Sequence, residues 1–214
     1  MGQYYRAIFI NENQKPITSI VSYDFGSGAK LMEHSWAKNP FVRFVERQLM
    51  ITPQRIVWGG DYADNEDPST LTPLEIKGLA DDDSEYTNTQ KIKENGANLY
   101  DLSHLVGKLT HDISSKGDDR EKEFARVISP NNAKYLVNHT KQEFIDKSKT
   151  PKDADGWCIH PLPLMTCEGN GRGGGDFRGD DKLVGIWARD LIGATTKKSD
   201  IPKGFKEIIF DLKE

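Results

Sequence analysis

Short stretches of β-branched and aromatic residues, separated by polar turns, recur along the chain and predict strands. "QYYRAIFI" (3–10) and "ITSIVSY" (17–23) flank the turn-like "NENQKP", which predicts a hairpin. "QRIVWGG" (54–60) predicts a buried strand that ends in glycines. Further stretches with strand character are 133–139, 143–146, 156–160, 182–192 and 205–212.

Fewer stretches predict helices. The clearest is 40–50, where Asn39 can cap the helix and Pro40 suits its first turn. Its apolar face consists of Phe41, Phe44, Val45 and Leu49. Shorter helices are expected at 97–109 and within "LTPLEIKGL" (71–79). Because strands outnumber helices and do not alternate with them, the fold class is expected to be α+β, with a mainly antiparallel sheet and a few helices.

Two segments of the chain resemble each other. "FINENQKPI" (9–17) and "LVNHTKQEF" (136–144) both contain two apolar residues, an Asn, polar positions and then a second strand. Each is followed by a Leu-Met pair and later by an apolar strand that meets an acidic residue. Two similar half-domains would explain this pattern, and so would a chance similarity between two hairpins.

The length of 214 residues suits a single globular domain spanning 1–214. The composition changes after Asp61, where nine acidic residues and one lysine occur up to Glu85. This bias predicts an acidic, solvated insertion at about 61–95.

Composition also limits location and partners. No apolar run approaches the ~18 residues that span a bilayer, so no membrane partner is expected. The first residues, "MGQYYRAIFINENQ", lack the features of a signal peptide, and the two cysteines, Cys158 and Cys167, are expected to be reduced thiols. We therefore expect a cytoplasmic protein. A net charge of −4 argues against nucleic acid as a partner.

The chemically most distinctive stretch is "EGNGRGGGDFRGDD" (168–181), which has six glycines, two arginines and four acids. It contains the letters G-x-G-x-x-G, but no strand–turn–helix context surrounds them, so the dinucleotide fingerprint does not apply. No Gly-Lys-Ser/Thr follows, which excludes a P-loop. An anion site, a metal-assisted site and a tight connection without chemistry remain as alternatives.

An anion site is the leading interpretation of this loop. Successive glycines can turn their N–H groups inward as a nest, and two arginines can fork onto a phosphate or carboxylate. The residues expected to bind the ligand are Gly171, Arg172, Gly173, Gly174, Gly175 and Arg178. No ligand set with zinc or EF-hand spacing is present, so no metal site is assigned and the cofactor stays unknown.

Candidate catalytic residues are Asp61, Asp176 and His34. The acids suggest hydrolysis with an activated water, and His34, beside Glu33, suits a general base near neutral pH. Cys167 can also be read as a nucleophile, but its apolar neighbours favour a buried thiol. If the two halves match, Asp61, Asp64, Arg178 and Asp190 are expected to share one cleft.

Several phrases resemble a group of uncharacterised proteins. These phrases are "MGQYY", "FGSGAKLMEHS", "GDYAD", "NHTKQEF" and "GNGRGGGDFRGDDKLVGIWARDLI". No activity is established for that group, so the resemblance transfers no catalytic residue. It implies that the glycine-rich loop and the "GDYAD" turn belong to one site.

Together these observations predict a binder of a small anionic ligand, such as a nucleotide or a phosphorylated metabolite, at the glycine-rich loop 169–179. Hydrolysis of that ligand is a further expectation. The alternative is a protein-interaction module whose acidic surface, 61–85, engages a basic protein partner.

Overall fold

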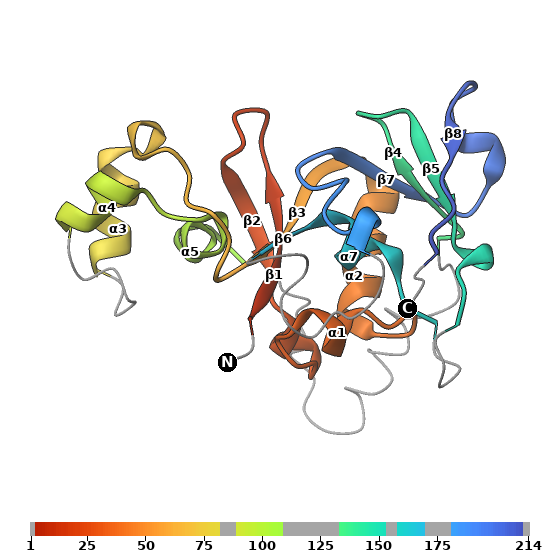
Figure 1. Cartoon of the computed structure of the whole chain (residues 1–214), viewed down its shortest axis with the longest axis horizontal. Coiled ribbons are helices and arrows are strands. Elements are labelled where there is room, and N and C mark those ends of the chain that lie inside the picture. Colours follow the sequence, from red (N-terminus) through yellow and green to blue (C-terminus); the bar gives the residue numbers. More distant parts are fainter. Residues whose placement is uncertain (1–2, 82–88, 109–132, 153–157, 170–180, 212–214) are drawn as a thin grey trace.

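The computed structural model describes residues 3–81, 89–108, 133–152, 158–169 and 181–211. Its centre is one sheet with the strand order β2-β1-β3-β7-β4-β5-β8, and β6 pairs with β3 beside this path (Figure 1). The strands are β1 (Tyr5–Ile10), β2 (Pro16–Ile20), β3 (Gln54–Gly60), β4 (Tyr135–Asn138), β5 (Glu143–Asp146), β6 (Cys167–Glu168), β7 (Leu191–Thr195) and β8 (Lys206–Glu207). All pairs are antiparallel except β3–β6 and β5–β8. The expected α+β class with a mainly antiparallel sheet is confirmed.

The sheet has two arms with the same local topology. In the first arm, the β1–β2 hairpin is followed by helices and then by β3, which pairs with β1. In the second arm, the β4–β5 hairpin is followed by helical turns and then by β7, which pairs with β4. The arms meet where β3 pairs with β7. The hairpin turns also match, because Gln14 (φ 61°) and Gln142 (φ 58°) both adopt the left-handed conformation.

Helices on one face of the sheet close the main core. They are α1 (Leu31–His34), α2 (Pro40–Ile51) and α7 (Pro161–Thr166). The α2 helix begins as its sequence predicts: Pro40 occupies the first turn, and the Asn39 side chain accepts a hydrogen bond of 2.8 Å from the backbone N–H of Phe41. Each helix packs against a strand of the other arm: α2, which precedes β3, packs against β7, and α7, which precedes β7, packs against β3.

Short 3₁₀ turns connect the larger elements. They are η1 (Ser22–Phe25), η2 (Pro68–Thr70), η3 (Ser103–Leu105), η4 (Lys147–Lys149), η5 (Asp181–Leu183) and η6 (Lys198–Asp200). Two of them, η1 and η4, take equivalent places, because each follows the second strand of a hairpin.

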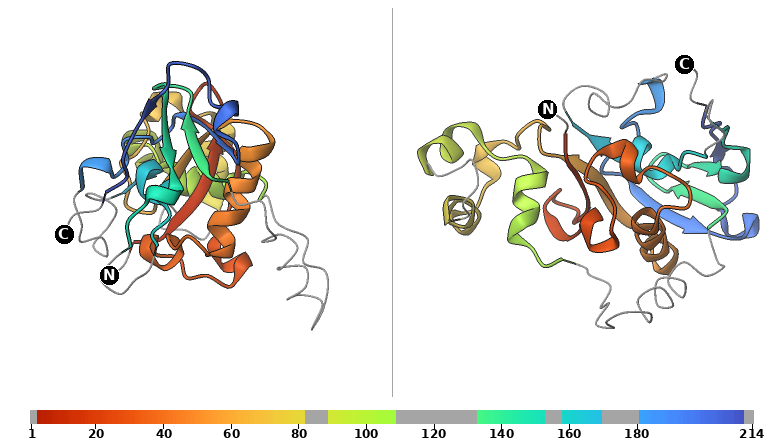
Figure 2. Two further views of the ribbon diagram at one scale, coloured as in Figure 1. Left: turned by 90° about the vertical axis from the view of Figure 1, so that its right-hand side faces the viewer. Right: turned by 90° about the horizontal axis from the view of Figure 1, so that it is seen from below.

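The other face of the first arm carries a helical lobe. Its helices are α3 (Pro73–Asp81), α4 (Thr89–Asn95) and α5 (Leu99–Leu102), and the right-hand view in Figure 2 shows them at one end of the molecule. Leu71, Leu79 and Ile92 are buried against Ile8 and Val57 of the sheet in a second core. The acidic insertion expected at about 61–95 is therefore solvated in part: Asp64, Asp67 and Asp81 are exposed, whereas its apolar positions gain stability by covering the sheet.

One expected strand is largely absent. Residues 182–192 read as a continuous apolar strand, but η5 and a turn occupy most of the stretch, and β7 begins only at Leu191. Gly185 (φ 73°) and Arg189 (φ 65°) adopt left-handed backbone conformations, which a strand does not accommodate. The helix expected at 97–109 is reduced to α5 and η3, and the strand expected at 205–212 is reduced to β8.

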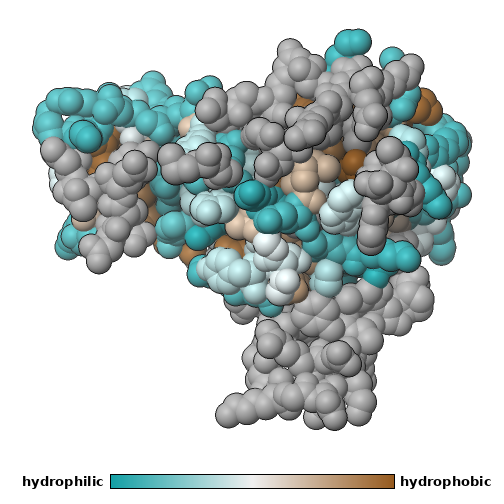
Figure 3. Space-filling model, turned by 60° about the horizontal axis from the view of Figure 1, so that its bottom comes forward, coloured by the Kyte–Doolittle hydropathy of each residue, from teal (hydrophilic) through white to brown (hydrophobic). Residues whose placement is uncertain are grey.

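The surface of the described chain is mainly hydrophilic, with small hydrophobic areas on the face that Figure 3 presents. Within the described residues, no helix has the length and apolar character needed to cross a membrane.

Candidate functional site

All six residues expected to bind a ligand lie outside the described part of the chain. These are Gly171, Arg172, Gly173, Gly174, Gly175 and Arg178, together with the candidate catalytic residue Asp176. The anion loop therefore stays a prediction. The structure describes the residues on which the loop begins, Glu168 and Gly169.

The loop begins against a buried polar pair near the amino terminus. Gln3 is buried, and its side-chain oxygen accepts a hydrogen bond of 2.7 Å from the Tyr5 hydroxyl. Its amide nitrogen is buried without a hydrogen-bond partner among the described residues. A Cβ at Gly169 or at Gly60 would collide with this pair, so a larger residue at either position would force the Gln3 and Tyr5 side chains to shift.

Arg189 joins the acidic segment to the base of the loop. Its guanidinium donates hydrogen bonds of 2.6 and 2.8 Å to the Glu168 carboxylate and of 2.6 and 3.2 Å to the Glu66 carboxylate. Burial alone would lower the pKa of Arg189, but these hydrogen bonds and charges raise it further above its usual range. One cation thus serves two carboxylates, which leaves the base of the loop acidic.

Two described members of the expected cleft, Asp61 and Asp190, lie apart. Asp61 is half-buried, accepts a hydrogen bond of 3.0 Å from the Tyr4 N–H and anchors the amino-terminal segment. Asp190 lies at the opposite end of β3, where it accepts a hydrogen bond of 2.8 Å from the Asn138 side chain. The expected cleft of Asp61, Asp64, Arg178 and Asp190 is therefore not formed by its described members, because the turn at Arg189 directs Asp190 elsewhere. His34 ends α1, which lies in the main helical layer.

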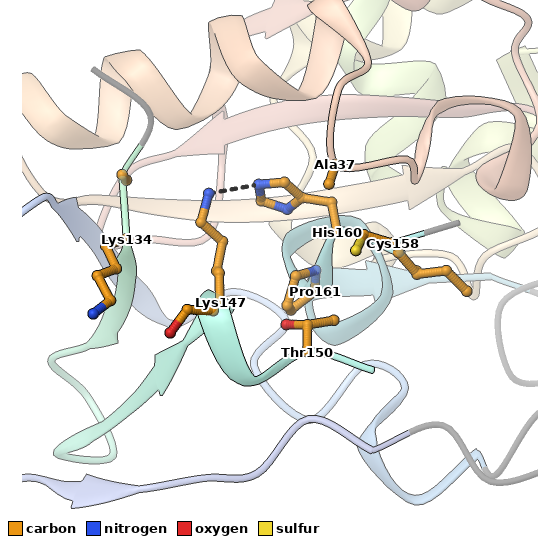
Figure 4. A pocket seen from close by; sticks show the side chains of 10 residues that line it. Ala37, Lys134, Lys147, Thr150, Cys158, His160 and Pro161 are labelled. Carbon is orange, nitrogen blue, oxygen red and sulfur yellow. Dashed lines mark hydrogen bonds between the residues drawn. The ribbon is translucent and has the colours of Figure 1, made fainter. Parts of the chain in front are cut away.

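A different place in the fold combines a cavity with buried titratable groups. A cavity of about 310 Å³ lies beside η4 and the start of α7. The described residues that line it include two lysines, one histidine, two hydroxyl residues and one cysteine, but no carboxylate. They are Ala37, Ala133, Lys134, Lys147, Ser148, Thr150, Cys158, Ile159, His160 and Pro161. Figure 4 shows the Lys147 side chain reaching toward the His160 ring, with Pro161 and Thr150 beside it.

Behind this cavity, Lys147, Glu46 and His160 form a buried cluster, which we call the buried triad. The Lys147 ammonium donates a hydrogen bond to Glu46 Oε1, and its nitrogen lies 3.3 Å from His160 Nε2. His160 Nε2 lies 3.1 Å from the same Glu46 oxygen. His160 Nδ1 accepts a hydrogen bond of 3.2 Å from the Leu162 N–H and so caps α7. This bond assigns the ring hydrogen to Nε2, which donates it to Glu46.

Each member of the buried triad has a shifted pKa. Burial lowers the pKa of Lys147 below that of an ordinary lysine, and the Glu46 charge opposes this shift. Burial and the Lys147 charge lower the pKa of His160, so its imidazole is neutral at pH 7. Burial would raise the pKa of Glu46, but the charges and hydrogen bonds of His160 and Lys147 outweigh it and keep the carboxylate ionised.

The two cysteines differ in their suitability for chemistry. Cys167 is buried, its thiol donates to the Leu164 carbonyl at 3.2 Å, and burial raises its pKa to about 12. Such a thiol is a poor nucleophile, which agrees with its expected role as a buried thiol. Cys158 is half-buried and lines the cavity.

The buried triad is a site that the sequence interpretation missed. Glu46 carried the clearest signal, because it lies within the apolar face of α2 between Val42 and Leu49, and it is buried there. A carboxylate in such a position requires a buried partner. Lys147 and His160 are more than a hundred residues away, at sequence separations of 101 and 114, so no local pattern connects them to Glu46.

Among the residues that the structure describes, no three His, Cys, Asp or Glu side chains are arranged to hold a metal ion. No protein family, curated protein or solved structure matches this chain.

Proposed function

We propose that the protein binds a small anionic ligand in the cavity beside η4. The observation that carries this proposal is the composition of the wall: two lysines, a neutral histidine and two hydroxyl residues line the cavity, and the carboxylates that pair with the lysines, Glu46 and Asp146, are not among its described lining residues. This composition is unusual in a chain whose net charge is −4. Cationic side chains and hydroxyl donors around a concave site favour phosphate or carboxylate groups.

The individual groups support this assignment. Lys134 is exposed on the rim, where its ammonium forms a long ion pair of 3.9 Å with the Asp146 carboxylate, and about half of its side chain remains accessible to a ligand. The Thr150 hydroxyl is buried without a hydrogen-bond partner among the described residues. A buried hydroxyl without a partner costs free energy, and a ligand oxygen in the cavity would satisfy it.

The size of the cavity narrows the ligand class. A volume of about 310 Å³ lies at the lower end of the range for small-molecule sites. It favours a phosphorylated metabolite of a few carbon atoms over a nucleotide. Glycerol 3-phosphate is a suitable first probe.

The glycine-rich loop 169–179 remains a second candidate for the same ligand class. The observation that favours it is the unpartnered amide N–H of Gln3, a hydrogen-bond donor buried beside Gly169. The two carboxylates at the base of the loop, Glu66 and Glu168, weigh against it. The loop variant Arg172→Ala/Arg178→Ala tests this location separately.

Isothermal titration calorimetry with inorganic phosphate, glycerol 3-phosphate and citrate tests the proposal. We expect Lys134→Gln/Thr150→Val to weaken binding about tenfold or more, because each lost contact contributes about 1 kcal/mol. Lys77→Gln removes an equal charge from an exposed position on α3 and is the matched control. Binding that survives in the cavity variant but is lost in the loop variant would move the site to the glycine-rich loop. No binding of any probe would contradict the proposal.

The acidic-surface alternative needs a sharper test than deletion of 65–85. Glu66 pairs with Arg189, Glu75 pairs with Lys15, and Leu71 and Leu79 belong to the second core, so a deletion would damage the fold. The exposed acids Asp64, Asp67 and Asp81 can be changed to asparagine together. A basic partner that depends on this surface would then bind more weakly, whereas glycerol 3-phosphate binding would not change.

A further inference from the structure

A second property of the cavity concerns the chemistry of Lys147 rather than its charge. Lys134 lines the same cavity, but its side chain is 49% exposed, whereas that of Lys147 is 15% exposed. The Lys147 backbone is fixed, since its N–H donates a hydrogen bond of 2.9 Å to the Lys134 carbonyl and η4 is capped by the Asp146 side chain. The cavity wall therefore contains one held, largely desolvated lysine and one half-exposed lysine, which pairs with Asp146 at the surface.

One proton acceptor, the Glu46 carboxylate, lies directly beside the held amine, whereas the nearby His160 Nε2 carries the ring hydrogen. Glu46 Oε1 accepts from the Lys147 nitrogen, and His160 Nε2 lies 3.3 Å from that nitrogen. Arg43 is a further charge near the triad. It interacts electrostatically with both Glu46 and His160, so the Glu46 carboxylate faces a second cation besides Lys147. Burial also lowers the pKa of Lys147, which increases the fraction of free amine at neutral pH.

We propose that Lys147 is a nucleophile that forms an imine with an aldehyde or ketone group of the anionic ligand. This inference rests on the proposed function, because the anionic group of the ligand is what brings the carbonyl into the cavity. The geometry that supports it is the placement of one buried amine in the cavity wall, with a carboxylate and an imidazole behind it.

The step balances without any further reactant. The Lys147 ammonium loses one proton to Glu46, and the free electron pair on nitrogen attacks the carbonyl carbon while the C=O π pair moves onto oxygen. One proton on nitrogen passes to that oxygen, and Glu46 returns its proton to nitrogen, which gives a carbinolamine. A second proton leaves nitrogen for the hydroxyl group, the C–O bond breaks, and water departs as the C=N bond forms. Two of the three ammonium protons thus leave in water, and the third stays on the iminium nitrogen.

The other groups of the cavity have separate roles in this scheme. Lys134, on the exposed side, meets the anionic group of the ligand, whereas the Ser148 hydroxyl donates to the Asp146 carboxylate at 2.6 Å. The unpartnered Thr150 hydroxyl is available to the carbonyl oxygen or to a neighbouring ligand hydroxyl. Glu46 is a positioning and proton-accepting residue, because it acts through Lys147 and does not itself line the cavity.

A trapping experiment with two closely matched compounds tests the inference. Glyceraldehyde 3-phosphate carries a carbonyl group, whereas glycerol 3-phosphate has the same anionic group and no carbonyl. The full chain is incubated with glyceraldehyde 3-phosphate and cyanoborohydride, which reduces an imine to a stable amine, and the modified lysine is located by peptide mass spectrometry. We expect one predominant adduct at Lys147, suppressed by excess glycerol 3-phosphate.

Variants make the result specific. Lys147→Arg keeps a cation beside Glu46, so we expect it to fold and to lose the adduct, whereas Lys134→Arg should keep it. Glu46→Gln keeps hydrogen-bonding groups but cannot take up the proton at neutral pH. We expect it to slow trapping at least tenfold and to change the pH profile of the trapping rate, which a purely structural role would not do.

Two outcomes would overturn the inference, and they are distinguishable from each other. If glycerol 3-phosphate binds in a manner sensitive to Lys134→Gln/Thr150→Val but the adduct is spread over exposed lysines, Lys147 is not a nucleophile and the anion site stands. If neither compound binds and no adduct forms at Lys147, the anion site and the nucleophile are both contradicted.

Discussion

In the two arms of the sheet, the turn after the hairpin packs against the helical layer with different side chains: aromatic in one arm and charged in the other. In the first arm, η1 contributes Phe25, whose ring lies 5.9 Å from that of Phe41 and 5.0 Å from that of Phe44. In the second arm, η4 contributes Lys147, which contacts Glu46 and His160. Both turns follow the second strand of a hairpin, and both contact α2: η1 packs against it, and Lys147 of η4 bonds to its Glu46. Aromatic rings fill one site, and ions fill the other.

This difference indicates what the fold requires and what it does not. The first arm demonstrates that apolar packing is sufficient to close a hairpin onto the helical layer. A buried ion cluster has a large desolvation cost, and apolar replacements are often equally stable. The buried triad is therefore not needed to form this architecture, and its position behind a cavity suits a role in ligand chemistry.

The largest effect is expected from removing the cation of the buried triad alone. Lys147→Met leaves the buried Glu46 carboxylate with a neutral imidazole and no adjacent ammonium. We expect a loss of about 3–5 kcal/mol in the free energy of unfolding, because one partner of a buried ion pair is left uncompensated. Urea denaturation at pH 7 measures this loss, and Lys134→Met, at a half-exposed position, is the control. A loss below about 1 kcal/mol, typical of exposed pairs, would place the ion pair effectively in solvent.

The next prediction makes the second arm resemble the first. Glu46→Leu/Lys147→Met removes both charges and replaces them with apolar groups. We expect it to recover about 3 kcal/mol relative to Lys147→Met, because apolar replacement of a whole buried ion pair is often neutral or stabilising. The same variant should lose lysine trapping completely. If the double variant is as unstable as the single one, the ions are required for the fold and the comparison between the arms fails.

The sequence predicts regular elements better than it predicts this contrast. The hairpin patterns, the capped helix at 40–50 and the strand at 54–60 were all recognisable, because each depends on residues that are neighbours in sequence. The strand expected at 182–192 was wrong, since its apolar residues pack from a turn that contains two left-handed positions, Gly185 and Arg189. Backbone conformations of this kind leave no apolar pattern to read.

The site was the least predictable part. Glu46 and Lys147 are 101 residues apart, and only the fold brings them together. The glycines and charged residues clustered at 168–181 form a conspicuous local pattern, and the predicted site was placed there for that reason. A charged residue within an apolar helical face, as at Glu46, is the more informative signal for a buried site.

A smaller expected effect is a pH dependence of the free energy of unfolding that arises from the second arm. His160 has a pKa below its ordinary value of 6.5 when folded, because of burial and the Lys147 charge. Below pH 6.5 the unfolded chain binds a proton that the folded chain excludes, so stability decreases as the pH falls from 7 to 5, by at most about 1.4 kcal/mol per pH unit.

His160→Asn keeps an N-cap acceptor for α7 and should remove most of this slope, which urea denaturation at several pH values would measure. His139 is half-buried and its pKa is also lowered by burial, so His139→Asn should remove a smaller part. An unchanged slope in His160→Asn would mean that His160 is solvated or already protonated in the folded chain. At the matching place in the first arm, Phe25, Phe41 and Phe44 carry no titratable group, so that place contributes no such slope.

The smallest expected effect tests whether the arms are alike where their sequences are alike. Gln14 and Gln142 hold left-handed conformations in the two hairpin turns, at a cost of about 1 kcal/mol each for a residue with a side chain. Glycine removes that cost but gains freedom in the unfolded chain, so we expect Gln14→Gly and Gln142→Gly each to stabilise the protein by about 0.5 kcal/mol. Gln14→Ala and Gln142→Ala should give no such gain, since alanine keeps the Cβ. Equal gains at both turns, measured by thermal unfolding, would show that the two arms share the backbone strain of their turns as well as their strand order. A gain at one turn and a loss at the other would confine that likeness to the order of the strands.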